Sequence, residues 1–138
     1  MIRYTDSLDN IGIEHLEGFF EGWQRAVTPQ EHLKVLVASQ RVLLAIDEET
    51  GNVVGFVTAI TDGLLTGYIP LLEVLPKYRR QGIGTTLMRR MAEELADLYT
   101  VDLICDAELQ PFYKRLGMQY AGPGMIIHND ARSLERNK

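Results

Sequence analysis

The chain has 138 residues, a formal net charge of -5 and a hydrophobic content of 46%. This composition is typical of one globular domain, so we expect a single domain over residues 1–138, with 129–138 as a frayed polar tail. The acidic balance argues against a nucleic-acid partner, because neutralising phosphates requires a surplus of Lys and Arg. The single cysteine, Cys105, excludes an intrachain disulfide and a cysteine-rich zinc site.

No basic segment followed by an apolar run opens the chain, and no apolar stretch approaches the ~18 residues of a membrane span. We therefore expect a cytoplasmic protein without a membrane partner. The three histidines, His15, His32 and His128, are scattered along the sequence. No group of potential ligands has metal-binding spacing, so the sequence predicts no metal site.

The N-terminal part predicts a strand at Ile2–Tyr4 and a helix over residues 11–24, in which apolar side chains cluster. Three aromatic residues of this helix are either its core face or a wall for a substrate: Phe19, Phe20 and Trp23. We favour the core. Acidic side chains recur along the same helix.

A second helix begins more clearly. Thr28 can cap it, a proline follows in the first turn, and Glu31 stands at the capping-box position. We expect it to run to about Ala38. Its buried residues should be Leu33, Val35, Leu36 and part of Val37. His32, in the first turn, is expected at the surface.

Three β-rich runs follow, at Arg41–Asp47, Val53–Thr61 and Tyr68–Leu75. The polar segment between the first two predicts a hairpin. Pro70 predicts an irregular ladder in the third, because proline cannot donate a ladder hydrogen bond.

The C-terminal half predicts a strong amphipathic helix at Gly84–Leu98, a strand at Val101–Cys105 and a short helix at Gln110–Leu116. Gly117 is placed to end that helix. Residues 118–121 and 125–128 are expected to form a closing hairpin. The order of elements is therefore mixed α/β.

The charge is unevenly distributed. Residues 1–63 hold ten acidic side chains against four basic ones, whereas residues 74–92 hold five basic side chains and no acidic one. Within the basic run, a strand is followed by a turn in which Gly82 and Gly84 open a long helix. Glycines let a ligand approach the backbone, and the free amides of a helix N-terminus attract anions. The pattern predicts a cradle for a phosphate or pyrophosphate.

A dinucleotide-binding Rossmann fold also places glycines before a helix, and Asp106 lies 22 residues after Gly84, near the spacing of its ribose-binding acid. However, Leu87 replaces the third glycine of that motif. The residues that remain after Asp106 are also too few for the second half of a doubly wound sheet. The sequence therefore disfavours a Rossmann fold.

The stretch Leu72–Thr85 resembles the acyl-CoA-binding motif of the GCN5-related N-acetyltransferases (GNAT), hydrophobic-x-Val-x-Pro-x-x-Arg-x-x-Gly-x-Gly or Ala. The matching positions are Leu72, Val74, Pro76, Arg79, Gly82 and Gly84. A second family element has Asn, a small residue, Phe-Tyr and Gly-Phe. Here it reads Asp106, Leu109, Phe112-Tyr113 and Gly117-Met118, so Asp, Leu and Met replace three family residues.

The resemblance implies a single-domain α/β fold with a mixed, mostly antiparallel sheet, flanked by helices, whose central strands splay apart. The splay would admit the pantetheine arm of acetyl-CoA, the implied co-substrate. Backbone amides of 80–85 would hold the pyrophosphate, and the backbone at 74–75 would pair with the arm. The implied cofactor-binding residues are Val74, Leu75, Arg79, Arg80, Gln81, Gly82, Ile83, Gly84, Thr85, Asp106 and Arg115. For Arg115, as for Lys114, a solvated cation at a helix end is the alternative.

Acyl transfer to an amine needs a base, a polarised thioester carbonyl and a proton for the leaving thiolate. The resemblance makes Tyr113 the acid, since a phenol with pKa ~10 holds its proton at neutral pH. The alternative is a packed tyrosine with its hydroxyl at the surface. Glu73 is the acid nearest the thioester site in sequence, and strand alternation directs it either to the acceptor cleft or to solvent. The other candidate bases are Glu17, Glu21, His32 and a water chain.

We therefore expect an acyl-CoA-dependent N-acyltransferase that transfers acetyl to a primary amine of a small molecule, by direct attack in a ternary complex. The acceptor site should come from residues 11–35 and 62–67. The acids Glu14, Glu17 and Glu21 suit a cationic acceptor, although a solvated helix face has the same pattern. The alternatives are a non-catalytic acyl-CoA sensor and an enzyme that acetylates a protein or peptide amine. A homodimer is compatible with the sequence.

Overall fold

The computed structural model describes residues 1–122, 124, 125 and 127. They fall into two compact units, residues 1–105 and the residues from 106 onward, and each unit is described by itself. The predicted tail, 129–138, lies outside the described residues. Within the described part of the chain, no helix combines the length and the apolar character needed to cross a bilayer.

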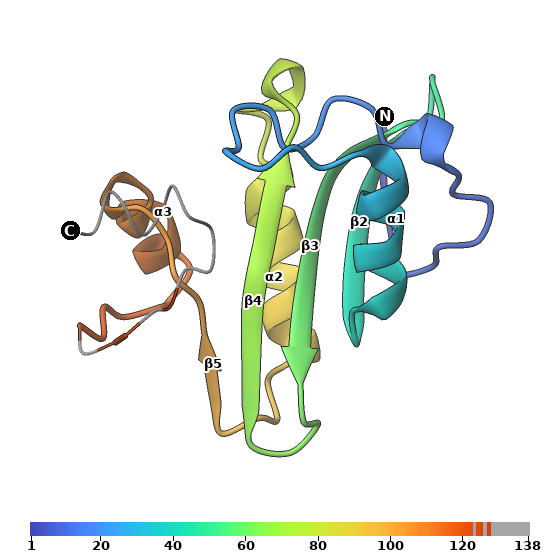
Figure 1. Ribbon diagram of the computed structural model, residues 1–138. Helices are drawn as coiled ribbons and strands as arrows, with labels where there is room; N and C mark the ends of the chain where they lie inside the picture. The colour runs from blue at the N-terminus through green and yellow to red at the C-terminus, as the bar shows by residue number, and fades with distance from the viewer. Residues whose placement is uncertain (123, 126, 128–138) are drawn as a thin grey trace. The chain divides into compact units, whose positions relative to one another are not determined.

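The first unit is built on a five-stranded sheet in the order β1-β2-β3-β4-β5. Figure 1 labels the strands from β2 to β5. Its strands are β1 (Ile2–Thr5), β2 (Arg41–Asp47), β3 (Val53–Thr61), β4 (Thr66–Val74) and β5 (Thr100–Asp102). Neighbouring strands are antiparallel except β4 and β5, which are parallel. The five strands predicted within residues 1–105 are confirmed, although β4 begins two residues earlier than predicted and β5 ends at Asp102 instead of Cys105.

Helices α1 (Pro29–Ala38) and α2 (Ile83–Glu94) lie on opposite faces of this sheet (Figure 1). The predicted cap of α1 is present: the Thr28 hydroxyl accepts the Glu31 N–H at 3.1 Å, and the Glu31 carboxylate accepts the Thr28 N–H at 3.1 Å. Helix α2 packs directly on β3, where a Cβ added at Gly55 would stand 3.2 Å from both Ile83 and Leu87.

The predicted helix over residues 11–24 is wrong. This segment holds one 3-10 turn, η1 (Ile13–His15), followed by turns. Its backbone enters the left-handed region three times, with φ of 94° at Gly18, 65° at Phe20 and 81° at Gly22, and a right-handed helix cannot continue through such residues. Phe19 and Phe20 nevertheless pack in the core, as favoured from the sequence, whereas Trp23 is 52% exposed.

The buried face of α1 also differs from the prediction. Val35 and Val37 are exposed, and the buried residues are His32 and Leu36. These two side chains share one face because they are four positions apart in a helix. The predicted surface position of His32 is therefore wrong: this side chain is 1% exposed.

Strand β4 carries the features that the sequence predicted for it. Its register with β3 shifts between the pairs Leu71–Thr58 and Tyr68–Ile60, at the position of Pro70. On its other edge, β5 pairs only with residues 66–68 of β4. Residues 69–74 are left without a strand on that edge in the described part of the chain, which is the splay that the resemblance implies.

The second unit contains a 3-10 turn, η3 (Ala107–Leu109), and helix α3 (Gln110–Arg115). Gly117, with φ of 93°, ends the helix as predicted. The closing hairpin is not formed by its described residues, because 118–122, 124, 125 and 127 adopt no strand. The rest of that predicted hairpin lies outside the described residues.

Candidate functional site

The turn between β4 and α2 has the shape of an anion cradle. A 3-10 turn, η2 (Pro76–Tyr78), leads to Arg80 and Gly82, which are both left-handed, with φ of 64° and 81°. Gly82 is the N-cap of α2, without a side-chain cap, and the first turn of α2 holds no acidic residue. Successive amides in such a left-handed turn, together with a helix N-terminus, form a concave donor surface for an anion.

The space in front of this cradle is open. A Cβ added at Gly82 would find no atom within 4 Å among the described residues, and Gln81 and Gly82 are exposed. Ile83, in contrast, is 3% exposed and anchors the first turn of α2 in the core. The amides of Ile83, Gly84 and Thr85 belong to the first turn, where an α-helix offers no internal acceptor. The cradle is thus accessible at Gln81 and Gly82 and anchored in the core by Ile83.

The neighbouring end of β4 presents backbone groups to its unpaired edge. The Leu75 N–H donates to the Val54 carbonyl of β3 at 2.9 Å. Because successive residues of a strand direct their backbone groups to opposite edges, the groups of Val74 face the edge that β5 leaves open. An extended ligand that lies along this edge can therefore pair with the Val74 N–H as an additional strand would, whereas the Val74 carbonyl already accepts a hydrogen bond from Arg79.

Two side chains fix the turn between the strand end and the cradle. Arg79 Nε donates to the Val74 carbonyl at 2.9 Å, so this predicted cofactor residue also shapes the turn itself. The Tyr78 hydroxyl donates to Asp47 Oδ2 at 2.6 Å, at the end of β2. The bond from Tyr78 is the main reason why the pKa of Asp47 is lowered. Sequence reasoning missed this tyrosine–aspartate pair because its members are 31 positions apart.

Glu73 is hydrogen-bonded to the segment that precedes α1, residues 16–28. The Phe20 N–H donates to both of its carboxylate oxygens, at 3.0 and 3.2 Å. Glu73 is half-buried, and burial raises the pKa of its carboxyl group, against the lowering effect of the Phe20 amide and of Arg79. A carboxylate with a raised pKa, held in one orientation, has the properties of a general base.

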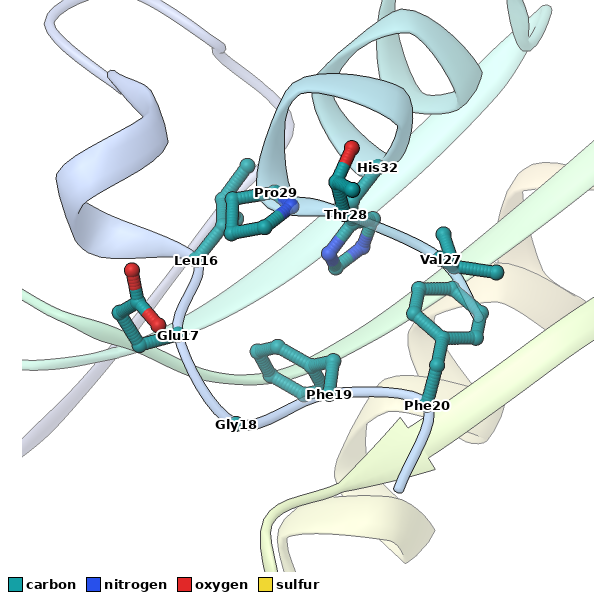
Figure 2. Close-up of a pocket in the computed structure, with 9 residues that line it drawn as sticks. All are labelled: Leu16, Glu17, Gly18, Phe19, Phe20, Val27, Thr28, Pro29 and His32. Atoms are coloured by element: carbon teal, nitrogen blue, oxygen red, sulfur yellow. The ribbon is translucent and has the colours of Figure 1, made fainter. Parts of the chain in front are cut away.

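A pocket of about 160 Å³ lies between this segment and the start of α1 (Figure 2). Its lining residues are Leu16, Glu17, Gly18, Phe19, Phe20, Val27, Thr28, Pro29 and His32. Burial lowers the pKa of His32 from 6.5 to about 4, so its imidazole is neutral at pH 7. All of its lining residues fall within 11–35, the stretch from which the sequence led us to expect part of the acceptor site, but the burial of His32 was missed. The available signal was the i, i+4 spacing of His32 and Leu36, which places both on one helix face.

The remaining predicted site residues belong to the second unit. Asp106 is exposed, precedes η3 and makes no side-chain cap bond. Tyr113 is half-buried on α3, with its ring 4.9 Å from that of Phe112 in an edge-to-face arrangement. Arg115 is exposed in the last turn of α3. The structure thus groups Glu73 and residues 74–85 in the first unit, and these three residues in the second.

Metal ligands do not cluster in the described part of the chain, where no group of three or more His, Cys, Asp or Glu side chains is placed to hold an ion. Cys105 is a free, half-buried thiol.

The chain is similar to proteins of one family. Residues 8–118 match the family model described as acetyltransferase (GNAT) family. A GCN5-related N-acetyltransferase 3, chloroplastic, from Arabidopsis thaliana is 38% identical over 87 residues, which are 62% of this chain and 37% of that protein. This chain thus matches little more than a third of that relative's length. An uncharacterized N-acetyltransferase, ycf52, from Pyropia yezoensis is 23% identical over 83% of this chain and 68% of its own.

Solved structures agree with the family model. A provisionally assigned acetyltransferase from Deinococcus radiodurans R1 is 42% identical, with a TM-score of 0.88 over 93% of this chain and 88% of its own. A GNAT family acetyltransferase from Streptococcus pneumoniae is 27% identical, with a TM-score of 0.72 over 94% and 98%. The splayed sheet, the cradle and the family model, which covers residues of both units, lead to the same assignment. The chain belongs to the GNAT acetyltransferase family.

Proposed function

We propose that this protein transfers an acetyl group from acetyl-CoA to a primary amine of a small molecule, by direct attack of the amine in a ternary complex. The observation that carries the proposal is the open cradle at the start of α2, next to the unpaired edge of β4. The family supports acyl transfer in general, and the identity of donor and acceptor is our inference.

The residues fit coenzyme A. The amides of 80–85 would hold the pyrophosphate, and the Val74 N–H would pair with the pantetheine arm along the open edge of β4. Lys77 and Arg80, both exposed near the cradle, add positive charge. When bound, acetyl-CoA supplies the acyl thioester.

Glu73 is proposed to take the proton from the amine. Its pKa is raised by burial, and the Phe20 amide fixes the orientation of its carboxylate. An amine that is positioned against a bound acyl group gains most of its rate from the juxtaposition of the two reactants. Glu73 would accept the proton that the amine nitrogen loses as the new amide bond forms and the thioester C–S bond breaks.

Tyr113 is proposed to give its proton to the leaving thiolate, on the basis of its place in Phe112-Tyr113-x-x-x-Gly117. Asp106 and Arg115 are proposed as further contacts of the cofactor. These three assignments rest on the family motif. The acceptor is proposed to bind at the segment that precedes α1, whose Phe20 holds Glu73.

The test is release of free thiol from acetyl-CoA in the presence of a panel of small amines and short peptides. Glu73→Gln and Tyr113→Phe should each lower kcat by about 10²-fold or more, the usual effect of losing a general base or acid. Binding of CoA, measured by calorimetry, should remain unchanged. Tyr120→Phe is the matched control, because Tyr120 is 70% exposed in the same unit as Tyr113.

Three results would contradict the proposal. Binding of CoA without turnover of any amine would make the protein a sensor of the cofactor. Turnover of peptides but of no small amine would move the acceptor to another class. Tight binding of NAD without binding of CoA would overturn the assignment of the cradle.

A further inference from the structure

The first observation is a buried histidine without a protein partner. His32 is 1% exposed, and neither Nδ1 nor Nε2 has a hydrogen-bond partner among the described residues. Buried polar side chains are almost always hydrogen-bonded, and leaving one unsatisfied destabilises the fold. Because His32 also lines a pocket, an occupant of that pocket could supply the missing partner.

The second observation is the environment of the imidazole. It lies among three aromatic rings, with centroids 5.1 Å from Phe19, 4.9 Å from Phe20 and 4.4 Å from Phe56. Figure 2 shows it in the middle of the lining residues, beneath the first turn of α1. The edge of an imidazole N–H can rest on an aromatic face, but the bare nitrogen of a neutral imidazole needs a hydrogen-bond donor.

The third observation is the size of the pocket. At about 160 Å³ it is close to the ~150 Å³ of an apolar cavity that holds one benzene molecule. Its polar side chains other than His32 are engaged or exposed: the Thr28 hydroxyl accepts the Glu31 N–H, and Glu17 is exposed. The buried lining side chains other than His32 are apolar, and they favour an uncharged occupant, because a charge placed against them would lose its hydration.

We propose that the pocket around His32 binds an uncharged group of about one ring in size that carries a hydroxyl, with His32 as its hydrogen-bonding partner and Phe19 and Phe20 as its walls. A hydroxyl is both donor and acceptor, and it therefore complements either nitrogen of the neutral imidazole. The group belongs either to the amine acceptor or to a separate small ligand, and in both cases it is an uncharged, hydroxyl-bearing group of about one ring in size.

Phe20 connects the pocket to the proposed base. Its ring lines the pocket, whereas its N–H holds the Glu73 carboxylate at 3.0 Å. Phe20 is also one of three described residues other than glycine with a positive φ, a strained conformation that persists only when its surroundings enforce it. An occupant that shifts the Phe20 backbone together with its ring would therefore also move the group that orients Glu73.

The test uses the full chain without CoA, so it does not depend on acyltransferase activity. Phenol is titrated, with toluene as the analogue of similar shape that lacks the hydroxyl, and the imidazole nitrogens of His32 are followed by NMR. Phenol should shift the His32 and Phe20 signals saturably. Toluene should bind about tenfold more weakly, the effect of one lost hydrogen bond to a buried group.

Two variants at His32 separate hydrogen bonding from packing. His32→Leu should bind phenol and toluene equally, and His32→Gln, which keeps a donor and an acceptor, should restore part of the preference for phenol. His15→Gln is the matched control, because His15 lies outside the pocket lining, and it should behave like the wild type. If His32→Leu does not fold, the comparison of phenol with toluene on the wild type and on His32→Gln still decides.

The proposal fails if phenol and toluene bind equally to the wild type, if phenol leaves the His32 signals unchanged, or if the imidazole is bonded to a buried water that phenol does not displace. An assay of thiol release from acetyl-CoA then shows whether the bound group belongs to the acceptor or to a separate ligand. Competition between phenol and the amine identifies the group as part of the acceptor, and inhibition or activation without competition identifies a separate ligand.

Discussion

His32 should make the protein sensitive to mild acid. Burial lowers its pKa from 6.5 to about 4, so between these values the unfolded chain binds a proton at His32 that the folded chain does not bind. The free energy of unfolding therefore falls as the pH falls from 6.5 to 4, and the full contribution is present above 6.5. At 1.36 kcal/mol per pKa unit, the loss attributable to this residue is about 3 kcal/mol.

His32→Leu should abolish this loss. The two side chains are similar in size, and the pocket leaves room for the change. Near pH 7 the replacement should be close to neutral or slightly stabilising, because it removes two buried nitrogens that lack a protein partner in the described part of the chain. At pH 4 the variant should be more stable than the wild type by about 3 kcal/mol.

Urea unfolding at several values between pH 7.5 and 4 measures the difference, with His15→Gln as the control. The lowered pKa values of Asp47, Asp62 and Glu31 also cost stability in acid, but mainly below the window of His32 and equally in both proteins. Parallel profiles for the wild type and His32→Leu would refute the reasoning. An NMR titration in which the His32 imidazole titrates near 6.5 would do the same.

Three further predictions concern the cradle, the turn before it and the proposed base. Gly82→Ala and Gly63→Ala both place a side chain in open space at a positive φ, 81° and 77° respectively. Each should lower the free energy of unfolding in urea by about 1–2 kcal/mol. Only Gly82→Ala should also weaken CoA binding in calorimetry, so Gly63→Ala is its matched control. Tyr78→Phe removes the main cause of the lowered pKa of Asp47, so an NMR titration should show that pKa rising toward its usual 3.8. An unchanged pKa would mean that the hydrogen bond from Tyr78 to Asp47 is absent. Because the pKa of Glu73 is raised, kcat should rise with pH at values above 4.5, and Glu73→Gln should remove that limb of the profile.

Most of the first unit's sheet could be predicted because its sequence signals are local. Val53–Thr61 is rich in β-branched residues, and the observed strand has the predicted bounds. The start of α1 was equally predictable, since its cap, proline and Glu31 lie within four positions. The anion cradle followed from glycines at the start of a helix, although the left-handed Arg80 carries no signal in its residue type.

What the sequence could not predict depends on contacts between distant positions. Glu73 is bonded to Phe20 across 53 positions, and Tyr78 to Asp47 across 31. Local apolar spacing at residues 11–24 favours a helix, but nothing in the residue type of Phe20 announces a left-handed backbone. Tertiary contacts decide such conformations, and they outweigh local propensity.

The failed helix prediction explains how the site can exist. In an α-helix over 11–24, the Phe20 N–H would donate to the carbonyl of Leu16, four positions earlier, and could not hold the Glu73 carboxylate. Phe19 and Phe20, as consecutive helical residues, would also point in different directions. In the observed turns, both rings lie within about 5 Å of His32, and the Phe20 N–H reaches Glu73. The departure from helix thus frees a backbone donor for the proposed base and, with the same residue, lines the pocket.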